Sequence, residues 1–319
     1  MDNTVCIILN YNDADTVLDL VEKLKGSREI AHILVVDNRS TDSSWECLQR
    51  VYGPGAADGV RTGETSGGPS FPGTVPDVRL LRTERNGGYG YGNQAGISHA
   101  VRLWNPDYII IANPDIHVTD RCIRKVKTAL KQTPGGAVGS AMVAAPDGRR
   151  LFSYWDLLPM GRDLLDTGPV TRRLFKPWLI TPPGRLPAGG TEKSRIVGAV
   201  PGSFFVMDMK EFPGKEADQV FDEAVFLYCE EKILGQKLRE RGLKCVLVTD
   251  TQYVHAHSVT IDRNVAGIAA KQKILHKSKL YYYRRYLKAG PLAMAAARIF
   301  LGAVYTEVWV LTRVFRMKW

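Results

Sequence analysis

The sequence predicts an α/β protein in which a mostly parallel central sheet is flanked by helices, and three observations support this fold class. The run Tyr108–Ala112 is apolar and rich in β-branched residues, which is typical of a strand buried on both faces of a parallel sheet. Two other apolar segments, Thr4–Leu9 and Ile33–Val36, alternate with stretches of helical periodicity, and this order favours parallel strands joined by right-handed crossovers. Polar residues follow these strands, at the edge where open α/β sheets bind ligands.

The first strand is followed by a predicted helix over Ala14–Lys25, for which Asp13 or Asp15 can act as the N-cap. A second helix is expected over Ser43–Tyr52, after the second strand. Residues 53–77 are rich in Gly, Pro, Ser and Thr and show no periodicity. They are therefore predicted to form a flexible surface insertion.

A strand over Val78–Leu81 leads into Gly87–Gly92, which contains four glycines in six residues. Glycine allows the backbone to approach a ligand closely. The helix predicted next, over Asn93–Leu103, points its N-terminus at this segment, which favours an anion there. An ordinary tight turn is the alternative explanation for the glycines.

The buried strand Tyr108–Ala112 ends at Asn113-Pro114-Asp115, because proline cannot donate a hydrogen bond to a sheet. Asp115 is thereby placed just past the carboxyl end of the strand. A carboxylate in this position suits a hard divalent cation, which in turn binds diphosphate oxygens. The alternative is that Asn-Pro-Asp is only a turn.

The second half of the chain continues less regularly. A helix is expected over Asp120–Leu130 and a strand over Gly136–Ala144, whereas Pro146–Lys193 is predicted to be a long irregular segment with short helices. The later elements expected are apolar pieces at Ile196–Val200 and Ser203–Met207, a helix that ends near Arg241-Gly242, a strand at Lys244–Val248 and an extended piece at Tyr253–His257.

Composition and charge narrow the function classes. The 319 residues carry a formal net charge of +10, which suits a phosphorylated substrate, an anionic membrane or a nucleic acid. The five cysteines are scattered, so neither a disulfide framework nor a zinc site is expected, and a reducing compartment is predicted. No signal peptide and no clear transmembrane helix are expected. The absence of Gly-x-Gly-x-x-Gly after the first strand argues against a dinucleotide-binding fold.

Seven short motifs together resemble the inverting glycosyltransferases of family 2, in the branch that contains rhamnosyltransferases of bacterial polysaccharide synthesis. In chain order they are Ile-Leu-Asn-Tyr-Asn at 8–12, Val-Val-Asp-Asn-x-Ser-x-Asp at 35–42, Asn-Gly-Gly-Tyr-Gly-x-Gly-Asn at 86–93, Asn-Pro-Asp at 113–115, Phe-Asp-Glu at 221–223, Tyr-Cys-Glu-Glu at 228–231 and His-Ala-His-Ser at 255–258. The resemblance implies a glycosyltransferase-A (GT-A) domain over 1–277, with a nucleotide-sugar-binding half at 1–118 and an acceptor-binding half at 119–277.

The resemblance implies a nucleoside-diphosphate sugar as donor, with dTDP-rhamnose as the first guess from the branch. Asp37 matches the residue that usually hydrogen-bonds the pyrimidine base. The residues expected around the donor nucleotide are Asn10, Tyr11, Asp37, Asn38, Asn86, Gly87, Gly88, Asn93 and Asn113. Ordinary turn chemistry is the alternative for Asn10 and Asn38.

The resemblance also implies a divalent cation, Mg²⁺ or Mn²⁺, which neutralises the leaving diphosphate. Asp115 matches the second acid of the family's Asp-x-Asp motif, and Asn113 replaces the first. With one acid fewer, a metal ion would be held more weakly. His255 is the second expected ligand, and His257, two residues further on, is placed in the core or at the rim of the site.

A carboxylate within hydrogen-bond reach of the acceptor hydroxyl can act as the catalytic base. Family 2 carries this base in a Glu-Asp motif at the start of a helix, and Glu230-Glu231 stands in that place here. Glu231 is the expected base, with Glu230 beside it. The alternative is that both glutamates merely stabilise the helix N-terminus electrostatically.

The tail 278–319 is expected to form a basic, aromatic and amphipathic helical extension. Lys and Arg alternate with four tyrosines over 279–288, and an apolar stretch broken by three charged residues follows. This composition suits a helix lying in a membrane interface. Packing on the domain or formation of a homodimer is the alternative. No nucleic-acid motif is present, so nucleic-acid binding is not expected.

The sequence thus predicts an inverting, metal-assisted transferase of cell-surface polysaccharide synthesis that uses a glycan or a lipid-linked saccharide as acceptor. It is expected in the cytoplasm, on the inner face of the cytoplasmic membrane. A sugar-phosphate nucleotidyltransferase is an alternative, but Asn10-Tyr11-Asn12 does not form the triphosphate loop that such an enzyme needs. A non-catalytic sugar-nucleotide or glycan-binding module is a second alternative, against which the presence of Glu231 argues.

Overall fold

The computed structural model describes residues 2–53, 75–179, 193–256 and 267–314. Most of the predicted insertion 53–77, the end of the irregular segment 146–193 and the last residues of the tail therefore lie outside the described residues. The same holds for His257.

The described residues form one nine-stranded mixed sheet with the strand order β3-β2-β1-β4-β8-β6-β9-β5, and β7 pairs with β9 beside this path. Strands β1 to β4 pair in parallel, β8 is antiparallel to both β4 and β6, and β6 is again parallel to β9. The strand bounds are β1 Thr4–Asn10, β2 His32–Asp37, β3 Asp77–Arg82, β4 Tyr108–Ala112, β5 Ile116–His117, β6 Gly136–Ala144, β7 Ser194–Val197, β8 Phe204–Asp208 and β9 Lys244–His255.

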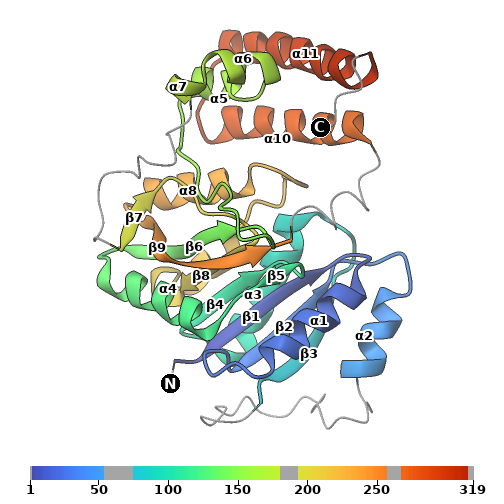
Figure 1. Ribbon diagram of the computed structural model, residues 1–319, viewed down its shortest axis with the longest axis vertical. Coiled ribbons are helices and arrows are strands. Elements are labelled where there is room, and N and C mark those ends of the chain that lie inside the picture. Colours follow the sequence, from blue (N-terminus) through green and yellow to red (C-terminus); the bar gives the residue numbers. More distant parts are fainter. Residues whose placement is uncertain (1, 54–74, 180–192, 257–266, 315–319) are drawn as a thin grey trace.

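Helices cover both faces of the sheet, because alternate strand residues are apolar on both sides (Figure 1). Helices α1 (Ala14–Leu24), α2 (Ser44–Tyr52) and α4 (Asp120–Gln132) pack on one face, against Cys6, Ile8, Ile33, Val35 and Ile110. Helices α3 (Tyr89–Trp104) and α8 (Glu230–Glu240) pack on the other, against Val5, Ile7, Leu34, Val36 and Ile109. Two 3-10 helices, η1 (Met209–Glu211) and η2 (Gly214–Gln219), follow β8.

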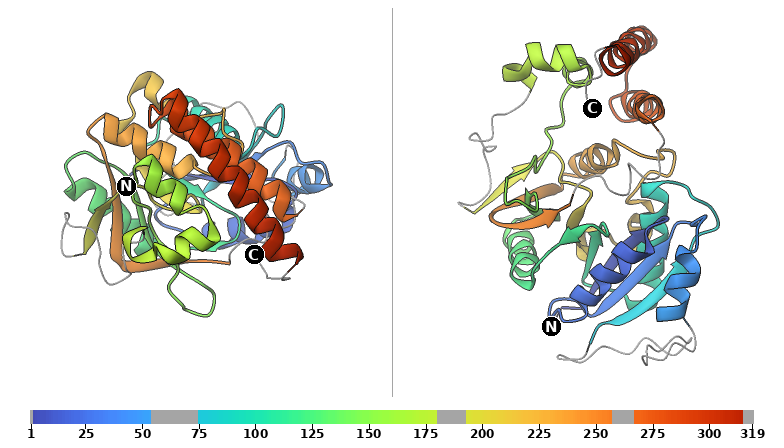
Figure 2. Two further views of the ribbon diagram at one scale, coloured as in Figure 1. Left: turned by 90° about the horizontal axis from the view of Figure 1, so that it is seen from above. Right: turned by 45° about the vertical axis from the view of Figure 1, so that its right-hand side comes forward.

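A separate group of helices lies beyond α8 at one end of the molecule (Figures 1 and 2). It contains the short helices of the irregular segment and the two helices of the tail, namely α5 Met160–Leu165, α6 Pro169–Leu174, α7 Lys176–Leu179, α10 Ile268–Arg285 and α11 Pro291–Arg313. Buried side chains of α8, α10 and α11 form a third apolar cluster, which includes Cys229, Ile233, Tyr282 and Tyr283. The helical layer is therefore packed onto the start of α8.

The α/β fold class is confirmed, and the elements differ from the predicted ones in three places. Helix α3 begins at Tyr89 rather than Asn93, so that Gly90 and Gly92 lie inside it. The two extended pieces near the end of the domain form one strand, β9, with a register shift opposite Ala141 and Met142. The predicted boundary at 277/278 falls within α10, which begins at Ile268.

Several of the tail residues expected at a membrane contact the domain, whereas Arg284, Arg285 and Lys288 are exposed. The Tyr283 hydroxyl donates to Asp163 Oδ2 at 2.6 Å, and the hydroxyls of Tyr281 and Tyr286 donate to Asp222 Oδ2 at 2.7 and 2.5 Å. Lys279 is buried as well. For this part of the tail, the alternative of packing on the domain is correct, because two carboxylates of the domain bind its polar atoms.

Candidate active site

A cavity of about 990 Å³ lies between the carboxyl ends of β1, β2 and β4 on one side and α8 and the helical layer on the other. Residues predicted from the sequence line it from both sides, and these are Tyr11, Asn38, Asn86, Gly88, Asn113, Asp115, Glu230, Glu231 and His255. Asn10, Asp37, Gly87 and Asn93 do not line it. The structure thus brings most of the predicted site residues to one cavity.

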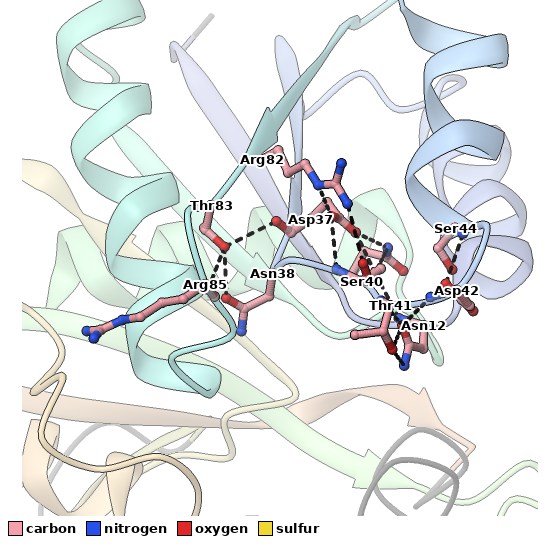
Figure 3. A network of polar contacts seen from close by, with 11 residues as sticks. Asn12, Asp37, Asn38, Ser40, Thr41, Asp42, Ser44, Arg82, Thr83 and Arg85 are labelled. Atoms are coloured by element: carbon pink, nitrogen blue, oxygen red, sulfur yellow. Dashed lines mark hydrogen bonds and ion pairs between the residues drawn. The ribbon is translucent and has the colours of Figure 1, made fainter.

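Asp37, at the end of β2, is fully buried and held by several partners (Figure 3). Its Oδ1 accepts hydrogen bonds from Asn10 Nδ2 at 2.8 Å and from Ser40 Oγ at 2.5 Å. Its Oδ2 accepts from the Ser40 backbone N–H at 3.1 Å and forms an ion pair with Arg82 Nε at 3.2 Å. The carboxylate therefore joins the ends of β1, β2 and β3.

The loop before α3 is tied to the end of β2 through Asn38. Its Nδ2 donates to Gly88 O at 2.9 Å and to Asn86 Oδ1 at 3.1 Å. Gly88 has a φ of +90°, and a Cβ at this position would lie 1.9 Å from the carbonyl oxygen of Phe226. Only glycine fits here, because the loop of the nucleotide half touches the loop that leads into α8.

Asp115 and His255 lie in contact on the cavity wall, with His255 Nε2 3.2 Å from Asp115 Oδ1. They are the one pair of a carboxylate and an imidazole in contact among the described residues of this wall. Asp115 directly precedes β5, and His255 is the last residue of β9. The two strands pair with each other, and Ile116 is the partner of His255. Ligands of one Mg²⁺ or Mn²⁺ ion, at about 2.1 Å each, stand about 3 Å apart, so this pair fits a shared cation. No group of three or more His, Cys, Asp and Glu able to hold a metal occurs in the described residues. The remaining ligands of a metal ion would be donor oxygens and water.

Glu230 and Glu231 open α8 directly after two strained residues. Tyr228 and Cys229 both have a φ of +70°, which is uncommon for residues other than glycine and clusters at functional sites. Glu230 is buried, with 5% of its surface exposed, and its Oε1 has no hydrogen-bond partner. Glu231 is half-buried, and the Gly202 N–H donates to its carboxylate.

The surroundings of the two glutamates act differently on their pKa values. Burial and the charge of Glu231 raise the pKa of Glu230 well above its ordinary value. Burial also raises the pKa of Glu231, although the backbone hydrogen bonds to its carboxylate oppose this shift. Because the Gly202 N–H donates to Glu231, the surroundings favour a negative charge on Glu231 more than on Glu230.

The sequence interpretation did not include several residues that complete the wall around Glu231. The Tyr89 hydroxyl donates to Gly202 O at 2.6 Å, and a Cβ on Gly202 would lie 3.0 Å from Glu231 Oε1. Lys232 and Lys279 line the cavity from α8 and α10. The Pro201-Gly202 turn was a visible signal, and Lys232 directly follows the recognised glutamates. The place of Lys279 depends on a contact across the fold that no local pattern reveals.

These features define a nucleotide-sugar transferase of the GT-A type, and the comparison with known families agrees. Residues 5–175 match the family model described as glycosyl transferase family 2. The chain belongs to this family, and its activity is that of a glycosyltransferase with a nucleotide-sugar donor.

Two curated relatives are similar to the chain over different lengths. The N-acetylglucosaminyl-diphospho-decaprenol L-rhamnosyltransferase of Mycobacterium tuberculosis is 30% identical over 253 residues, which cover 76% of this chain and 72% of that protein. The low-salt glycan biosynthesis hexosyltransferase Agl10 of Haloferax volcanii is 22% identical over 133 residues, 42% of this chain and 34% of that protein.

Solved structures agree on the fold. The mannosyltransferase PcManGT from Pyrobaculum calidifontis, in complex with GDP-Man and Mn²⁺, has a TM-score of 0.51 at 12% identity and covers 100% of this chain and 76% of its own. GalNAc-T7 with UDP, GalNAc and Mn²⁺ has a TM-score of 0.53 at 14% identity and covers 99% of this chain and 57% of its own. The predicted GT-A fold is thereby confirmed.

Proposed function

We propose that the protein transfers a sugar from a nucleoside-diphosphate donor, with dTDP-rhamnose as the first candidate, to a glycan or lipid-linked acceptor with inversion at the anomeric carbon. The observation that carries this proposal is that the pair Asp115 and His255 lines the same cavity as Glu231. The rhamnosyl donor is supported by the name of the Mycobacterium tuberculosis relative.

The donor nucleotide lies at the ends of β1 and β2. Tyr11, Asn38, Asn86 and Gly88 contact it from the cavity wall, and Asn113 lies beside its phosphates. Asp37 is fully buried behind the cavity wall, where Asn10, Ser40 and Arg82 hold its carboxylate, so it supports the base pocket without lining it. Asn10, Gly87 and Asn93 shape this wall from behind.

The donor diphosphate is held on the side of Asp115 and His255. A Mg²⁺ or Mn²⁺ ion bound here would neutralise the charge that develops on the leaving diphosphate. Asp115 would provide an oxygen ligand and His255 a nitrogen ligand. With two protein ligands, the other ligands of the ion would be phosphate oxygens and water, as is usual for Mg²⁺ sites that bind phosphorylated substrates.

Glu231 takes the proton from the acceptor hydroxyl while that oxygen attacks the anomeric carbon. Its raised pKa makes it a stronger base than an exposed glutamate, and the Gly202 N–H orients it. Direct attack from the face opposite the diphosphate inverts the anomeric carbon. Glu230, which is buried at the start of α8, supports this end of the helix and does not take this proton.

The acceptor side of the protein lies at the inner face of the cytoplasmic membrane. Within the described residues, α11 is the one helix long and apolar enough to cross a membrane by length and composition, and its apolar window is 28% buried. Its outward side chains include Leu292, Ile299 and Trp309, which are 88, 76 and 52% exposed. This exposed apolar face supports attachment to the membrane surface, and contact with a second copy of the chain is the competing explanation.

A donor panel tests the proposal. The protein is incubated with dTDP-rhamnose and other nucleotide sugars, with Mn²⁺, with Mg²⁺ and with a chelator, and release of the nucleoside diphosphate is measured. Metal-dependent release from one donor, and an inverted product when acceptor is added, is the expected result. Binding of donors without any release would favour a binding module, and release of inorganic diphosphate from a nucleoside triphosphate and a sugar phosphate would favour a nucleotidyltransferase.

A further inference from the structure

A buried network lies next to the proposed base and takes no part in the mechanism above. The carboxylate of Asp163, on α5, is 1% exposed and binds two lysines. Its Oδ2 is 2.5 Å from Lys279 Nζ, and its Oδ1 contacts Lys232 Nζ. The Tyr283 hydroxyl completes the shell at 2.6 Å from Oδ2.

The network contains two ammonium groups and one carboxylate. Burial alone would raise the pKa of Asp163, but Lys279 and Lys232 hold it well below its ordinary value. Burial alone would lower the pKa of Lys232, but Asp163 keeps it above the ordinary value. Asp163 and Lys232 thus each favour the charged form of the other. Buried charges that serve only to join helices are usually no better than apolar side chains of the same volume.

Both lysines line the cavity although their side chains are only 13% and 7% exposed. All four of the Lys and Arg residues on the described cavity wall come from the same side, from α6, α8 and α10, and these are Arg172, Lys232, Lys271 and Lys279. Arg172 is paired with Asp166 at 3.3 Å. None of the described cavity-wall residues that the proposal above assigns to the donor is a lysine or an arginine.

The same end of the cavity is apolar between the charges. Leu158, Leu179 and Leu275 line it, together with Phe152 and Trp155. The cavity wall also carries polar side chains, namely Asp156, Asp166, Thr167 and Gln272. An apolar chain that carries a phosphate matches the apolar side chains and the lysines together.

We propose that Lys232 and Lys279, oriented by Asp163, bind a phosphate group of the acceptor and hold its sugar hydroxyl at Glu231. This assignment rests on the proposed glycosyl transfer and names the chemical class of its acceptor as a phosphate-linked saccharide. Each lysine has three donor hydrogens, so each can contact Asp163 and still donate to a phosphate oxygen. Glu231 directly precedes Lys232, which sets the distance between the phosphate and the attacking hydroxyl.

Binding of simple phosphates in metal-free buffer tests the assignment without any donor. The full-length protein is titrated by calorimetry with farnesyl diphosphate, with farnesol and with inorganic diphosphate, in the presence of a chelator. Farnesyl diphosphate is expected to bind at least tenfold more tightly than farnesol, with an affinity that falls as salt is added. Measurable binding of inorganic diphosphate would show that the phosphate groups are sufficient for binding. Stronger binding of farnesyl diphosphate than of inorganic diphosphate would show that the apolar wall contacts a lipid chain.

The variants Lys279→Met and Lys232→Met remove one charge each while they keep the length of the side chain. Each variant should weaken the binding of farnesyl diphosphate by about 10- to 100-fold, which is the range expected for the loss of a hydrogen bond to a charged group. Lys277→Met is the matched control, because Lys277 is exposed on the same helix as Lys279 and does not line the cavity. It should bind like the parent.

Unchanged farnesyl diphosphate affinity in both folded cavity variants would overturn the assignment. Equal binding of farnesol and farnesyl diphosphate to the parent would also overturn it, and this comparison needs no variant if the lysine variants do not fold. Neither outcome bears on the donor panel, so failure of this inference and failure of the proposed glycosyl transfer can be distinguished.

Discussion

Glu230 and Glu231 are adjacent, but the fold gives them separate environments. Consecutive side chains on a helix point about 100° apart, so the two carboxyl groups cannot face the acceptor equally. Glu230 points into the buried start of α8, where its Oε1 has no partner, and Glu231 points to the Gly202 N–H in the cavity. This difference in environment is why Glu231, rather than Glu230, is the proposed catalytic base.

The variant Glu231→Gln keeps the shape of the side chain and removes the proton acceptor. We expect its kcat to fall by about 10²- to 10⁴-fold with nearly unchanged donor affinity, measured by steady-state kinetics and donor calorimetry. Glu231→Asp restores the residue more common in the family and should keep appreciable activity. The assignment is reversed if Glu231→Gln turns over like the parent while Glu230→Gln is inactive.

The variant Glu230→Gln tests the buried acid through stability. The folded state raises the pKa of Glu230 above its ordinary value of 4.5 and therefore holds the proton more tightly than the unfolded chain does. As the pH rises from 4.5 through the raised pKa, this group favours unfolding. Glutamine has no proton to lose, so we expect the Tm of Glu230→Gln to exceed that of the parent at pH 8 by about 2–4 °C, the shift for about 1 kcal/mol.

This difference in Tm should disappear near pH 4, where the parent carries the proton in both states. Glu240→Gln serves as the control, because Glu240 is exposed at the other end of the same helix. A pH-independent difference in Tm for Glu230→Gln would contradict the raised pKa.

Asp115→Ala tests the proposed metal pair. Removal of the proposed oxygen ligand should abolish transfer and weaken binding of the donor with Mn²⁺ by at least tenfold, because a metal ion held by Asp115 would stabilise the bound diphosphate. Donor binding in the presence of a chelator should change little. Calorimetry that finds the same metal-dependent donor affinity in a folded variant would exclude Asp115 as a ligand.

At the scale of elements, the contact between Gly88 and Phe226 joins the nucleotide half to the loop before α8. We expect Gly88→Ala to destabilise the protein by about 1–3 kcal/mol, because the new Cβ meets the Phe226 carbonyl and the backbone has a positive φ. Gly148→Ala is the matched control. Gly148 has a φ of +81° but no atom within 4 Å of the added Cβ, so it reports the backbone strain alone.

Chemical denaturation measures both variants. If the two glycine variants lose the same free energy of unfolding, the loop contact contributes nothing and the effect at Gly88 is backbone strain only. A larger loss at Gly88, together with reduced kcat, would show that the contact also positions the glutamates.

The elements that could be predicted from the sequence are those whose signal is local. The strands Thr4–Asn10 and Tyr108–Ala112 are apolar runs with a polar end, and this alone places Asn10 and Asp115 at one edge of the sheet. The predicted start of α3 at Asn93 was wrong, because glycine has a low helix propensity and Gly90 and Gly92 were therefore placed outside the helix. Tertiary packing outweighs that preference, since a Cβ on Gly92 would lie 2.4 Å from Leu9 Cδ1.

At the scale of the whole molecule, the helical layer forms part of the site rather than an appendage. Its composition could not reveal this, because tyrosines and lysines alternate in the same way at a membrane interface and at a buried protein contact. The partners that decide the matter are distant, since Lys279 binds Asp163 116 residues away and Tyr286 binds Asp222 64 residues away. Removal of residues 278–319 would therefore expose the cluster around Ile233 and disturb α8.

The membrane proposal is for this reason best tested by point variants on α11. Its inward stripe is Met294, Ala297, Leu301, Val304 and Val308, whereas Leu292 and Ile299 lie on the opposite side, which is apolar too. An exposed apolar helix face of this kind marks a contact with a membrane or with another protein surface. Exposed arginines at 298 and 313 flank that face and suit anionic lipid headgroups, at about 1 kcal/mol each.

We expect Ile299→Glu to reduce co-sedimentation of the protein with anionic vesicles by at least several-fold, because a charged side chain cannot enter the apolar part of the interface. Gln49→Glu adds the same charge on the exposed surface of α2, at the other end of the molecule, and should bind vesicles like the parent (Figure 1). Nucleotide binding should be unchanged in both, because neither side chain lines the cavity. If Ile299→Glu instead converts a dimer to a monomer in sedimentation experiments and vesicle binding is unchanged, a second copy of the chain covers α11.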